Sequence, residues 1–167
     1  MKLFLKILFI IILSYSSCVY ASNNLKFINL DKLVQETNLG KIMLDKINTL
    51  DKKNIDKLKL FEANLKKLEN DIKDKKNIIS NSEFENEINL LELKIKEYNK
   101  EKNTMVKNLN NFKNKELKIF FQKINPIIRN YMKKNSIEII FDNKNIFMGN
   151  QNSDLTLPLV NAINNNT

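Results

Sequence analysis

The residues that could do chemistry in this chain are few, and their spacing suits a helix surface better than a catalytic centre. Glu83, Glu85 and Glu87 lie close together, but they have the spacing of a solvated first helical turn and no partner beside them to tune acid–base catalysis. The sequence has no His, no Trp, two Gly and one Cys. These absences exclude an imidazole base, a His-ligated metal and a Gly-rich phosphate loop. We therefore expect no enzymatic activity, no metal site and no cofactor.

Lysine carries almost all of the positive charge. The 167 residues have a formal net charge of +9, and Arg129 is the single arginine. Five lysines gather toward the end of one predicted helix, namely Lys66, Lys67, Lys73, Lys75 and Lys76. They are either a solvated helix face or a surface that attracts acidic clients or an anionic membrane. The excess charge also suggests nucleic acid, but base recognition depends largely on Arg, so we predict no nucleic-acid partner.

The first 21 residues have the pattern of a secretory signal peptide. Two lysines precede an apolar run over residues 7–13, and Val19 and Ala21 are the small residues that a signal peptidase accepts. A membrane anchor is an alternative, but the apolar run is too short to span a bilayer of about 30 Å. A lipoprotein signal that ends at Cys18 is a further alternative. Cleavage after Ala21 would leave an exported chain with no cysteine and no disulfide.

A long helical hairpin is predicted for the middle of the chain. Residues 41–125 contain neither Gly nor Pro, and apolar residues recur there at alternating spacings of three and four, the period of coiled-coil helices. Ser82 and Glu85 form a capping box that would begin a second helix after a turn at 77–82.

Folding the hairpin at this turn brings its two apolar stripes together. Apolar residues then face apolar residues along most of the seam, and Leu65 faces Tyr98. Asp51 and Asn54 interrupt the stripe and oppose apolar positions, so we expect a place there where the hairpin could bend. Each helix of roughly 38 residues would reach about 57 Å.

Further apolar residues lie off this stripe, including Leu60, Leu90, Leu93 and Val106. They are either additional packing or positions that touch a client. The rest of the exported chain, 22–40 and 123–167, is too short to cover the hairpin along its whole length. Much of the hairpin must therefore face solvent or another copy.

The N-terminal flank predicts a strand and a short helix. Residues 25–30 are a strand candidate. Asp31 would cap a helix that ends at Gly40.

The C-terminal flank predicts two more strands and a helix. Residues 137–141 and 145–148 read as a β-hairpin joined by a turn at 142–144. Pro126 marks a break or kink after the long helix, and residues 154–163 predict a closing helix with Pro158 in its first turn.

So few strands bury little surface and leave open edges, which favours oligomerisation through this region. The residues expected to take part are Phe27, Ile137, Ile139, Phe141, Ile146 and Phe147. The predicted fold class is mostly α, with a long antiparallel coiled-coil helical hairpin that projects from a small β-containing oligomerisation head. The predicted domains are a signal peptide over 1–21, a head over 22–43 and 124–167, and an arm over 44–123.

The order of these segments resembles the Skp/OmpH family of periplasmic chaperones. The resemblance rests on four features: FINLDKLVQ over 27–35, the charged hairpin, IEIIFD over 137–142, and NIFM over 145–148 followed by SDLT over 153–156. It covers the whole exported chain. It implies a trimer whose strands form a common β body, with three helical arms around a cavity that holds unfolded outer-membrane proteins without ATP. The family offers no catalytic residues to carry over. The near-absence of Arg departs from the family and leaves a lipopolysaccharide site that depends on Arg without support.

These features predict an ATP-independent holdase in the periplasm of a Gram-negative bacterium, with unfolded outer-membrane β-barrel proteins as clients. The client-binding candidates are Lys66, Lys67, Lys73, Lys75, Lys76, Leu60, Leu90 and Leu93. The alternative is an exported coiled-coil structural or adaptor protein of the cell envelope. Such a protein would more often keep a membrane anchor or a lipid, so the fate of Cys18 separates the two.

Overall fold

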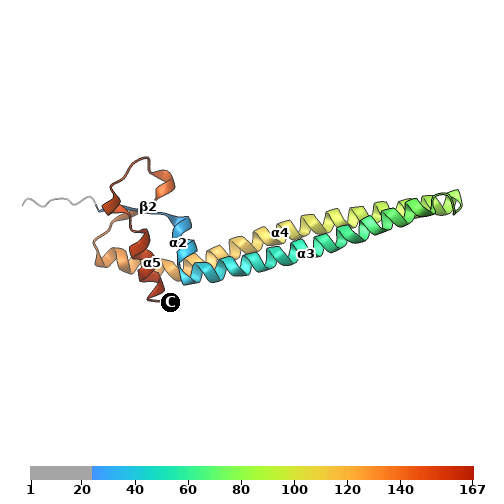
Figure 1. Ribbon diagram of the computed structural model, residues 1–167. Coiled ribbons are helices and arrows are strands. Elements are labelled where there is room, and N and C mark those ends of the chain that lie inside the picture. Colours follow the sequence, from blue (N-terminus) through green and yellow to red (C-terminus); the bar gives the residue numbers. More distant parts are fainter. Residues whose placement is uncertain (1–23) are drawn as a thin grey trace, which may run out of the picture.

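The computed structural model describes residues 24–167, so the predicted signal segment and Cys18 lie outside the described residues. The elements in chain order are β1 (Leu25–Ile28), α2 (Leu30–Glu36), α3 (Asn38–Lys75), α4 (Asn81–Lys134), β2 (Ile139–Asp142), the 3-10 helices η1 (Asn143–Asn145) and η2 (Gln151–Ser153), and α5 (Thr156–Asn164). A hairpin of α3 and α4 projects far beyond a small head that contains β1, α2, β2 and α5 (Figure 1). The predicted fold class is therefore confirmed.

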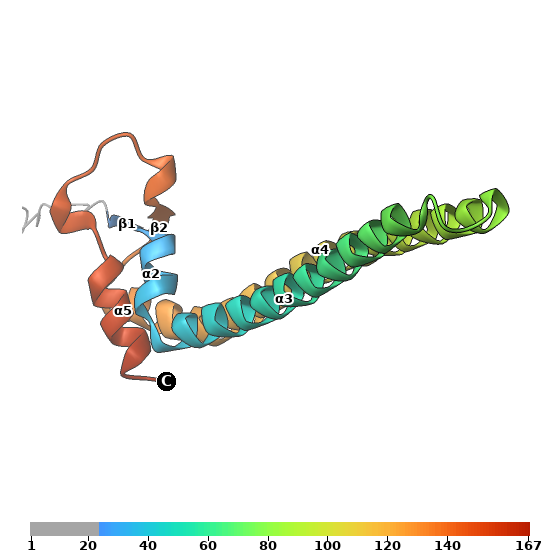
Figure 2. The same cartoon turned by 45° about the vertical axis from the view of Figure 1, so that its right-hand side comes forward.

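The projecting arm consists of two antiparallel helices of unequal length. The 38 residues of α3 correspond to a length of about 57 Å. α4 has 54 residues because its C-terminal part continues past the start of α3 into the head, where α2 and α5 pack beside it (Figure 2). The same helix therefore belongs to both the arm and the head.

The turn at the tip uses a capping box two residues earlier than predicted. α4 begins after Ser80, whose hydroxyl accepts a hydrogen bond from the Glu83 backbone N–H at 3.3 Å. The Glu83 carboxylate accepts one in return from the Ser80 backbone N–H at 3.0 Å. The sequence contains two overlapping Ser-x-x-Glu patterns, and the chain uses the first, which shortens the connection between the helices. The predicted box of Ser82 and Glu85 was wrong.

The seam between α3 and α4 covers side chains only partly, because a two-helix arm leaves one side of each helix in water. Ile72 and Met105 are buried, whereas most other apolar seam residues are half-buried. The ring of Tyr98 packs on Phe61 with a centroid distance of 5.5 Å. This contact lies one helical turn farther from the tip than the predicted partner, Leu65.

Polar residues lie on the seam toward the head. Asp51 and Asn54 are half-buried at the predicted interruption. Closer to the head, the buried Glu116 accepts a hydrogen bond from Lys46 at 3.2 Å. A bend at Asp51 and Asn54 stays a prediction.

The core of the head joins both ends of the chain to the base of the arm. Leu33 from α2, Ile124 from α4, and Leu159 and Ile163 from α5 are fully buried. Phe120 and Met43 belong to the same cluster and connect it to the lower arm.

The sheet has a different topology from the predicted one. β2 pairs with β1 in parallel, with Leu25 opposite Ile139 and Ile28 opposite Asp142. On the other edge of β1, the Leu155 N–H donates to the Phe27 carbonyl at 2.8 Å. The predicted β-hairpin was wrong, and residues 145–148 form no strand. The physical reason is local: the Asp142 carboxylate accepts from the Lys144 N–H at 3.2 Å and begins a 3-10 turn instead of a strand reversal.

The corner between α2 and α3 overturns two predicted helix boundaries. Asn29, not Asp31, caps α2, because its side-chain oxygen accepts from the Lys32 N–H at 2.9 Å. Gly40 does not end that helix: extended Thr37 separates α2 from α3 and caps α3 through the Gly40 N–H at 3.2 Å. Gly40 lies in the first turn of α3, where a Cβ atom would fall 1.8 Å from the Val34 carbonyl oxygen. A glycine is needed here because the Val34 carbonyl approaches its Cα closely, and not because a helix ends here.

We expect Gly40→Ala to destabilise the head by about 3 kcal/mol or more, because the added methyl would collide with backbone and not with a movable side chain. Helix propensity alone predicts the opposite sign, a gain of about 1 kcal/mol. Urea unfolding followed by circular dichroism measures the change. The exposed Asn48→Ala in the same helix is the control and should change stability by less than about 0.5 kcal/mol. Equal stability of Gly40→Ala and the parent would contradict this account of the corner.

Pro126 causes no break, because α4 continues through it to Lys134. A proline inside a helix costs about 3 kcal/mol through its missing N–H and its ring. Here Ile124 is fully buried beside it, and Ile127, Ile128 and Tyr131 pack against the core of the head. This packing offsets the cost. The predicted closing helix is confirmed as α5, with Pro158 in its first turn.

Candidate interaction surfaces

Glu83 and Glu87, two of the acidic residues near the tip, have structural partners. The Ser80 hydroxyl, and then its backbone N–H, hold the pKa of Glu83 below its ordinary value by donating to the carboxylate. Glu87 accepts from Lys75 at 2.8 Å, and this bond raises the pKa of that lysine. Within residues 24–167, no three His, Cys, Asp or Glu side chains gather closely enough to hold a metal ion. Nor does any helix in this range combine the length and hydropathy needed to cross a membrane.

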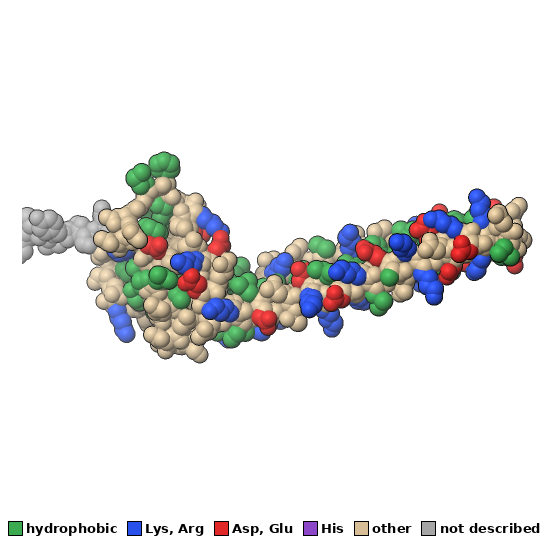
Figure 3. All heavy atoms as spheres, viewed as in Figure 1, with side chains coloured by type: hydrophobic (Ala, Val, Ile, Leu, Met, Phe, Trp, Pro, Cys, Tyr) green, Lys and Arg blue, Asp and Glu red, His purple; other side chains and the backbone are tan. Residues whose placement is uncertain are grey.

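The arm exposes apolar side chains along its length (Figure 3). Leu60 is 65% exposed and Leu93 is 57% exposed, and Leu90 and Val106 are also exposed. These residues therefore do not act as additional packing within the chain. As candidate client contacts, Leu60, Leu90 and Leu93 are at least accessible.

The five candidate lysines near the tip fall into two groups. Lys73 donates to Glu69 at 2.6 Å and Lys75 donates to Glu87 at 2.8 Å. The bond from Lys73 lowers the pKa of Glu69. The other three are exposed and have no ion pair within 4 Å among the described side chains, namely Lys66, Lys67 and Lys76.

The sheet of the head presents an apolar face to solvent. In the parallel register Leu25 lies opposite Ile139 and Phe27 lies opposite Phe141, so these four side chains share one face. Leu25, Ile139 and Phe141 are exposed, whereas Ile28 and Ile140 face the core. We call these four residues, Leu25, Phe27, Ile139 and Phe141, the sheet face. Leu25 was not among the residues predicted for oligomerisation. Its spacing of two from Phe27 could have identified it, because alternate residues of a strand share a face.

Other predicted oligomerisation residues occupy different environments. Ile137 is buried in the core of its own chain. Ile146 is half-buried, and Phe147 is fully exposed next to exposed Met148 on the loop between η1 and η2. The structure thus brings three of the six predicted residues onto the sheet face, Phe27, Ile139 and Phe141, and places the other three elsewhere.

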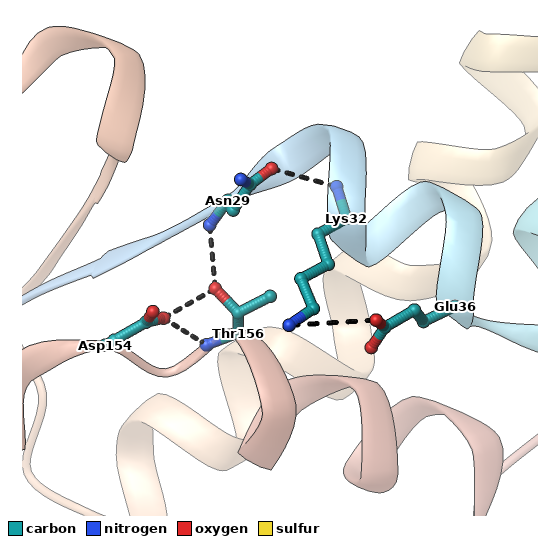
Figure 4. Close-up of polar contacts among 5 residues, drawn as sticks. All are labelled: Asn29, Lys32, Glu36, Asp154 and Thr156. Atoms are coloured by element: carbon teal, nitrogen blue, oxygen red, sulfur yellow. Dashed lines mark hydrogen bonds and ion pairs between the residues drawn. The ribbon is translucent and has the colours of Figure 1, made fainter. Parts of the chain in front are cut away.

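Hydrogen bonds lock the sheet to the C-terminal helix (Figure 4). The Thr156 hydroxyl accepts from the Asn29 backbone N–H at 2.8 Å and donates to the Asp154 carboxylate at 2.5 Å. The same carboxylate accepts from the Thr156 N–H at 2.8 Å. Because Thr156 is buried, these bonds fix the position of β1 relative to α5.

Comparison with known proteins identifies the family. Residues 24–163 match the family described as outer membrane protein (OmpH-like). The chain belongs to the OmpH-like family. This match includes the whole arm and nearly all of the head, so the OmpH-like assignment covers both candidate surfaces.

A solved structure shares the OmpH-like fold. It is a proposed outer membrane chaperone (OmpH-like) from Caulobacter crescentus, with a TM-score of 0.76 and 17% sequence identity over 88% of this chain and 87% of that chain. At this identity the likeness establishes the fold of the OmpH-like chain described here. No curated protein matches the sequence.

Proposed function

We propose that this OmpH-like chain is a holding chaperone of the periplasm that binds unfolded outer-membrane β-barrel proteins and prevents their aggregation. The family membership supports a chaperone role. The observation that carries the proposal is the arm, which extends far beyond the head and exposes apolar side chains such as Leu60 and Leu93. Several such residues repeated along one projecting arm offer an unfolded partner many apolar contacts.

Holding without ATP follows from many weak contacts. A client that loses one contact with an arm stays close because its other contacts hold it, so the effective concentration for rebinding is high. Each contact remains reversible, and release needs no nucleotide. The excess of lysine over acidic residues on the arm adds long-range attraction for acidic clients or an anionic membrane surface.

Assembly through the head would arrange several arms around one client. The sheet face supports this part of the proposal, because a second copy would remove Leu25, Ile139 and Phe141 from water. Among residues 24–167, no strand covers the outer edge of β2. Three copies is the number that the family resemblance implies. In this arrangement residues 22–43 and 124–167 form the head, 44–123 form the arm, and 1–21 direct export.

Two measurements test the proposal. Native mass spectrometry should detect a trimer that takes up one urea-unfolded β-barrel protein, and light scattering should show that the chaperone suppresses aggregation of that protein without ATP. A trimer that leaves aggregation unchanged would favour the alternative of a structural or adaptor protein.

The tip lysines are expected to speed client capture. Replacing Lys66, Lys67, Lys73, Lys75 and Lys76 by Gln should slow association with an acidic client by about three- to tenfold at low salt. The difference should shrink at physiological ionic strength, where charges more than about 8 Å apart are screened. Stopped-flow fluorescence at the two salt concentrations measures both effects.

A matched variant separates position from total charge. Gln at five lysines nearer the head changes the net charge equally, and these exposed residues are Lys52, Lys53, Lys59, Lys113 and Lys118. A smaller effect of this second variant supports a role for the tip. Equal association rates for the parent and the tip variant at both salt concentrations would show that the tip lysines are only a solvated helix face with no role in capture.

A further inference from the structure

Three hollows lie between α3 and α4 along the outer part of the arm. The first, of about 510 Å³, is lined by Lys57, Phe61, Glu97 and Thr104 among others. The second, of about 330 Å³, shares Phe61 and Glu97 with the first. The third, of about 410 Å³, lies at the tip beside Ile79 and Leu90. The first two are therefore neighbours, and the third continues toward the end of the arm.

The hollows form one groove because their lining residues keep to one side of each helix. The α3 residues 57, 61, 64, 68 and 75 follow each other at spacings of three, four or seven, with Leu65 beside Asn64, and Ile79 lies in the turn after α3. The α4 residues 83, 87, 90, 94, 97, 101 and 104 repeat at spacings of three and four, with Asn86 and Lys100 beside them. Residues with this spacing share a helix face. We call this hollowed side, from Lys57 to Ile79, the arm groove. Along α4, from Glu83 to Thr104, its length is about 32 Å at 1.5 Å per residue.

The exposed leucines of the arm lie on the groove side. Leu90 lines the hollow at the tip. Leu60 lies three residues after Lys57 and four before Asn64, and Leu93 lies four residues before Glu97, so the helical repeat places both beside groove residues. The groove therefore has a partly apolar floor and apolar borders.

The groove side also carries lysines that have no ion-pair partner. Three of its four lining carboxylates have lysine partners, since Glu101 pairs with Lys57 at 2.5 Å, Glu97 with Lys94 at 2.8 Å and Glu87 with Lys75 at 2.8 Å. The fourth, Glu83, accepts hydrogen bonds from Ser80. Lys100 lines the first hollow, and Lys67 and Lys96 lie one turn from groove residues. None of these three lysines has an ion pair within 4 Å in the described part of the chain. An occupant with both apolar and acidic side chains would complement this surface.

We propose that the arm groove binds an extended segment of unfolded polypeptide in which apolar side chains alternate with polar or acidic ones. This inference rests on the proposed holding function and assigns it a site. The first two hollows are centred about five residues, or roughly 8 Å, apart along α3. An extended chain places successive side chains of one face about 6.6 to 6.8 Å apart. Neighbouring apolar side chains on one face of the segment therefore enter neighbouring hollows, and about ten residues span the groove.

Two sets of substitutions test the site in the full oligomer. The groove variant replaces Leu60, Leu90 and Leu93 by Gln. The matched variant replaces Ile55, Val106 and Leu117 by Gln. These residues are also exposed, between 40% and 53%. Ile55 and Val106 each lie two positions from a groove residue and so face the other way, and Leu117 lies beyond the groove toward the head. Gln is a good helix former, so circular dichroism should show unchanged helicity for both.

The probe is a fluorescent twelve-residue peptide in which Phe, Leu and Val alternate with Asp, Ser and Thr. Fluorescence anisotropy should show binding to the parent and at least about tenfold weaker binding to the groove variant, with less than about a twofold change for the matched variant. A second peptide of the same composition, with its apolar residues spaced by three and four, should bind more weakly. Equal losses in both variants, or tighter binding of the second peptide, would overturn the assignment.

The aggregation assay separates this inference from the proposed function. A groove variant that loses peptide binding and suppresses aggregation less well than the matched variant supports both. Full suppression of aggregation by a groove variant with unchanged peptide affinity rejects the groove and leaves the holding function in place. Groove-dependent peptide binding by a parent protein that suppresses no aggregation rejects the holding function and leaves the groove.

Discussion

Ile139→Asp is expected to convert the assembled protein into monomers with intact helices. Ile139 is 46% exposed in the single chain and lies opposite Leu25 on the sheet face, so the substitution leaves the core of the head untouched. In the assembly the same position would be covered, and a carboxylate there would lose its water without gaining a partner. A loss of about 3 kcal/mol per interface would weaken association by more than about a hundredfold. Sedimentation velocity at micromolar concentration measures the change.

Two neighbouring substitutions make this result specific. Ile139→Val keeps an apolar side chain and should leave the oligomer intact. Ile137→Asp, in contrast, introduces a charge into the core and should unfold the head, which circular dichroism and urea unfolding would detect. A parent protein that is already monomeric at this concentration, with its helices formed, would show that the proposed assembly is wrong.

Removal of the outer arm is expected to abolish holding while leaving the oligomer unchanged. Replacing residues 55–104 by a four-residue Gly/Asn/Ser loop shortens α3 and α4 by similar lengths, because the ion pair of Lys57 with Glu101 shows that these two ends lie opposite each other. The pair of Lys46 with Glu116 and the contact region around Met43 and Phe120 remain. The truncated protein should therefore assemble normally. Its suppression of aggregation should fall by at least about tenfold, because the deleted segment carries the arm groove and the tip lysines.

The control carries the same loop inserted after Asn77, which leaves the first two hollows of the arm groove intact and should retain most of the holding of the parent. Sedimentation and light scattering are measured on both proteins. A truncated protein that no longer assembles would show that the arm, not the head, drives oligomerisation. Full holding by an assembled truncated protein would place the client site in the head.

The arm could be predicted from the sequence because its structure depends on local information. The absence of Gly and Pro over 41–125 permits unbroken helices, and the repeat of apolar residues chooses the faces that meet. The position of the turn was predicted to within two residues, and the error arose because Ser80-Glu83 and Ser82-Glu85 are equally good capping boxes. The lysines and the off-seam leucines were also visible in the sequence as candidates. Which leucines share a groove depends on how the two helices are rotated about their axes, and only their packing decides this.

The head depended on contacts between distant parts of the chain. A run such as 145–148 has the propensity of a strand, but the 3-10 turn over Asn143–Asn145 prevents the chain from returning along β2, which pairs instead with the distant β1. Residues 25–28 and 139–142 are separated by the whole arm, and strand propensity does not state which partner or direction a strand will choose. Gly40 is a second example in which local sequence rules could not predict a tertiary contact. Local rules interpret a glycine after a short helix as a stop, whereas the approach of the Val34 carbonyl, which only the folded corner creates, is what requires it. The sequence alone thus determined the helices of the arm through spacing and capping, and tertiary packing decided the strand partners, the corner and the groove, because those depend on which surfaces finally meet.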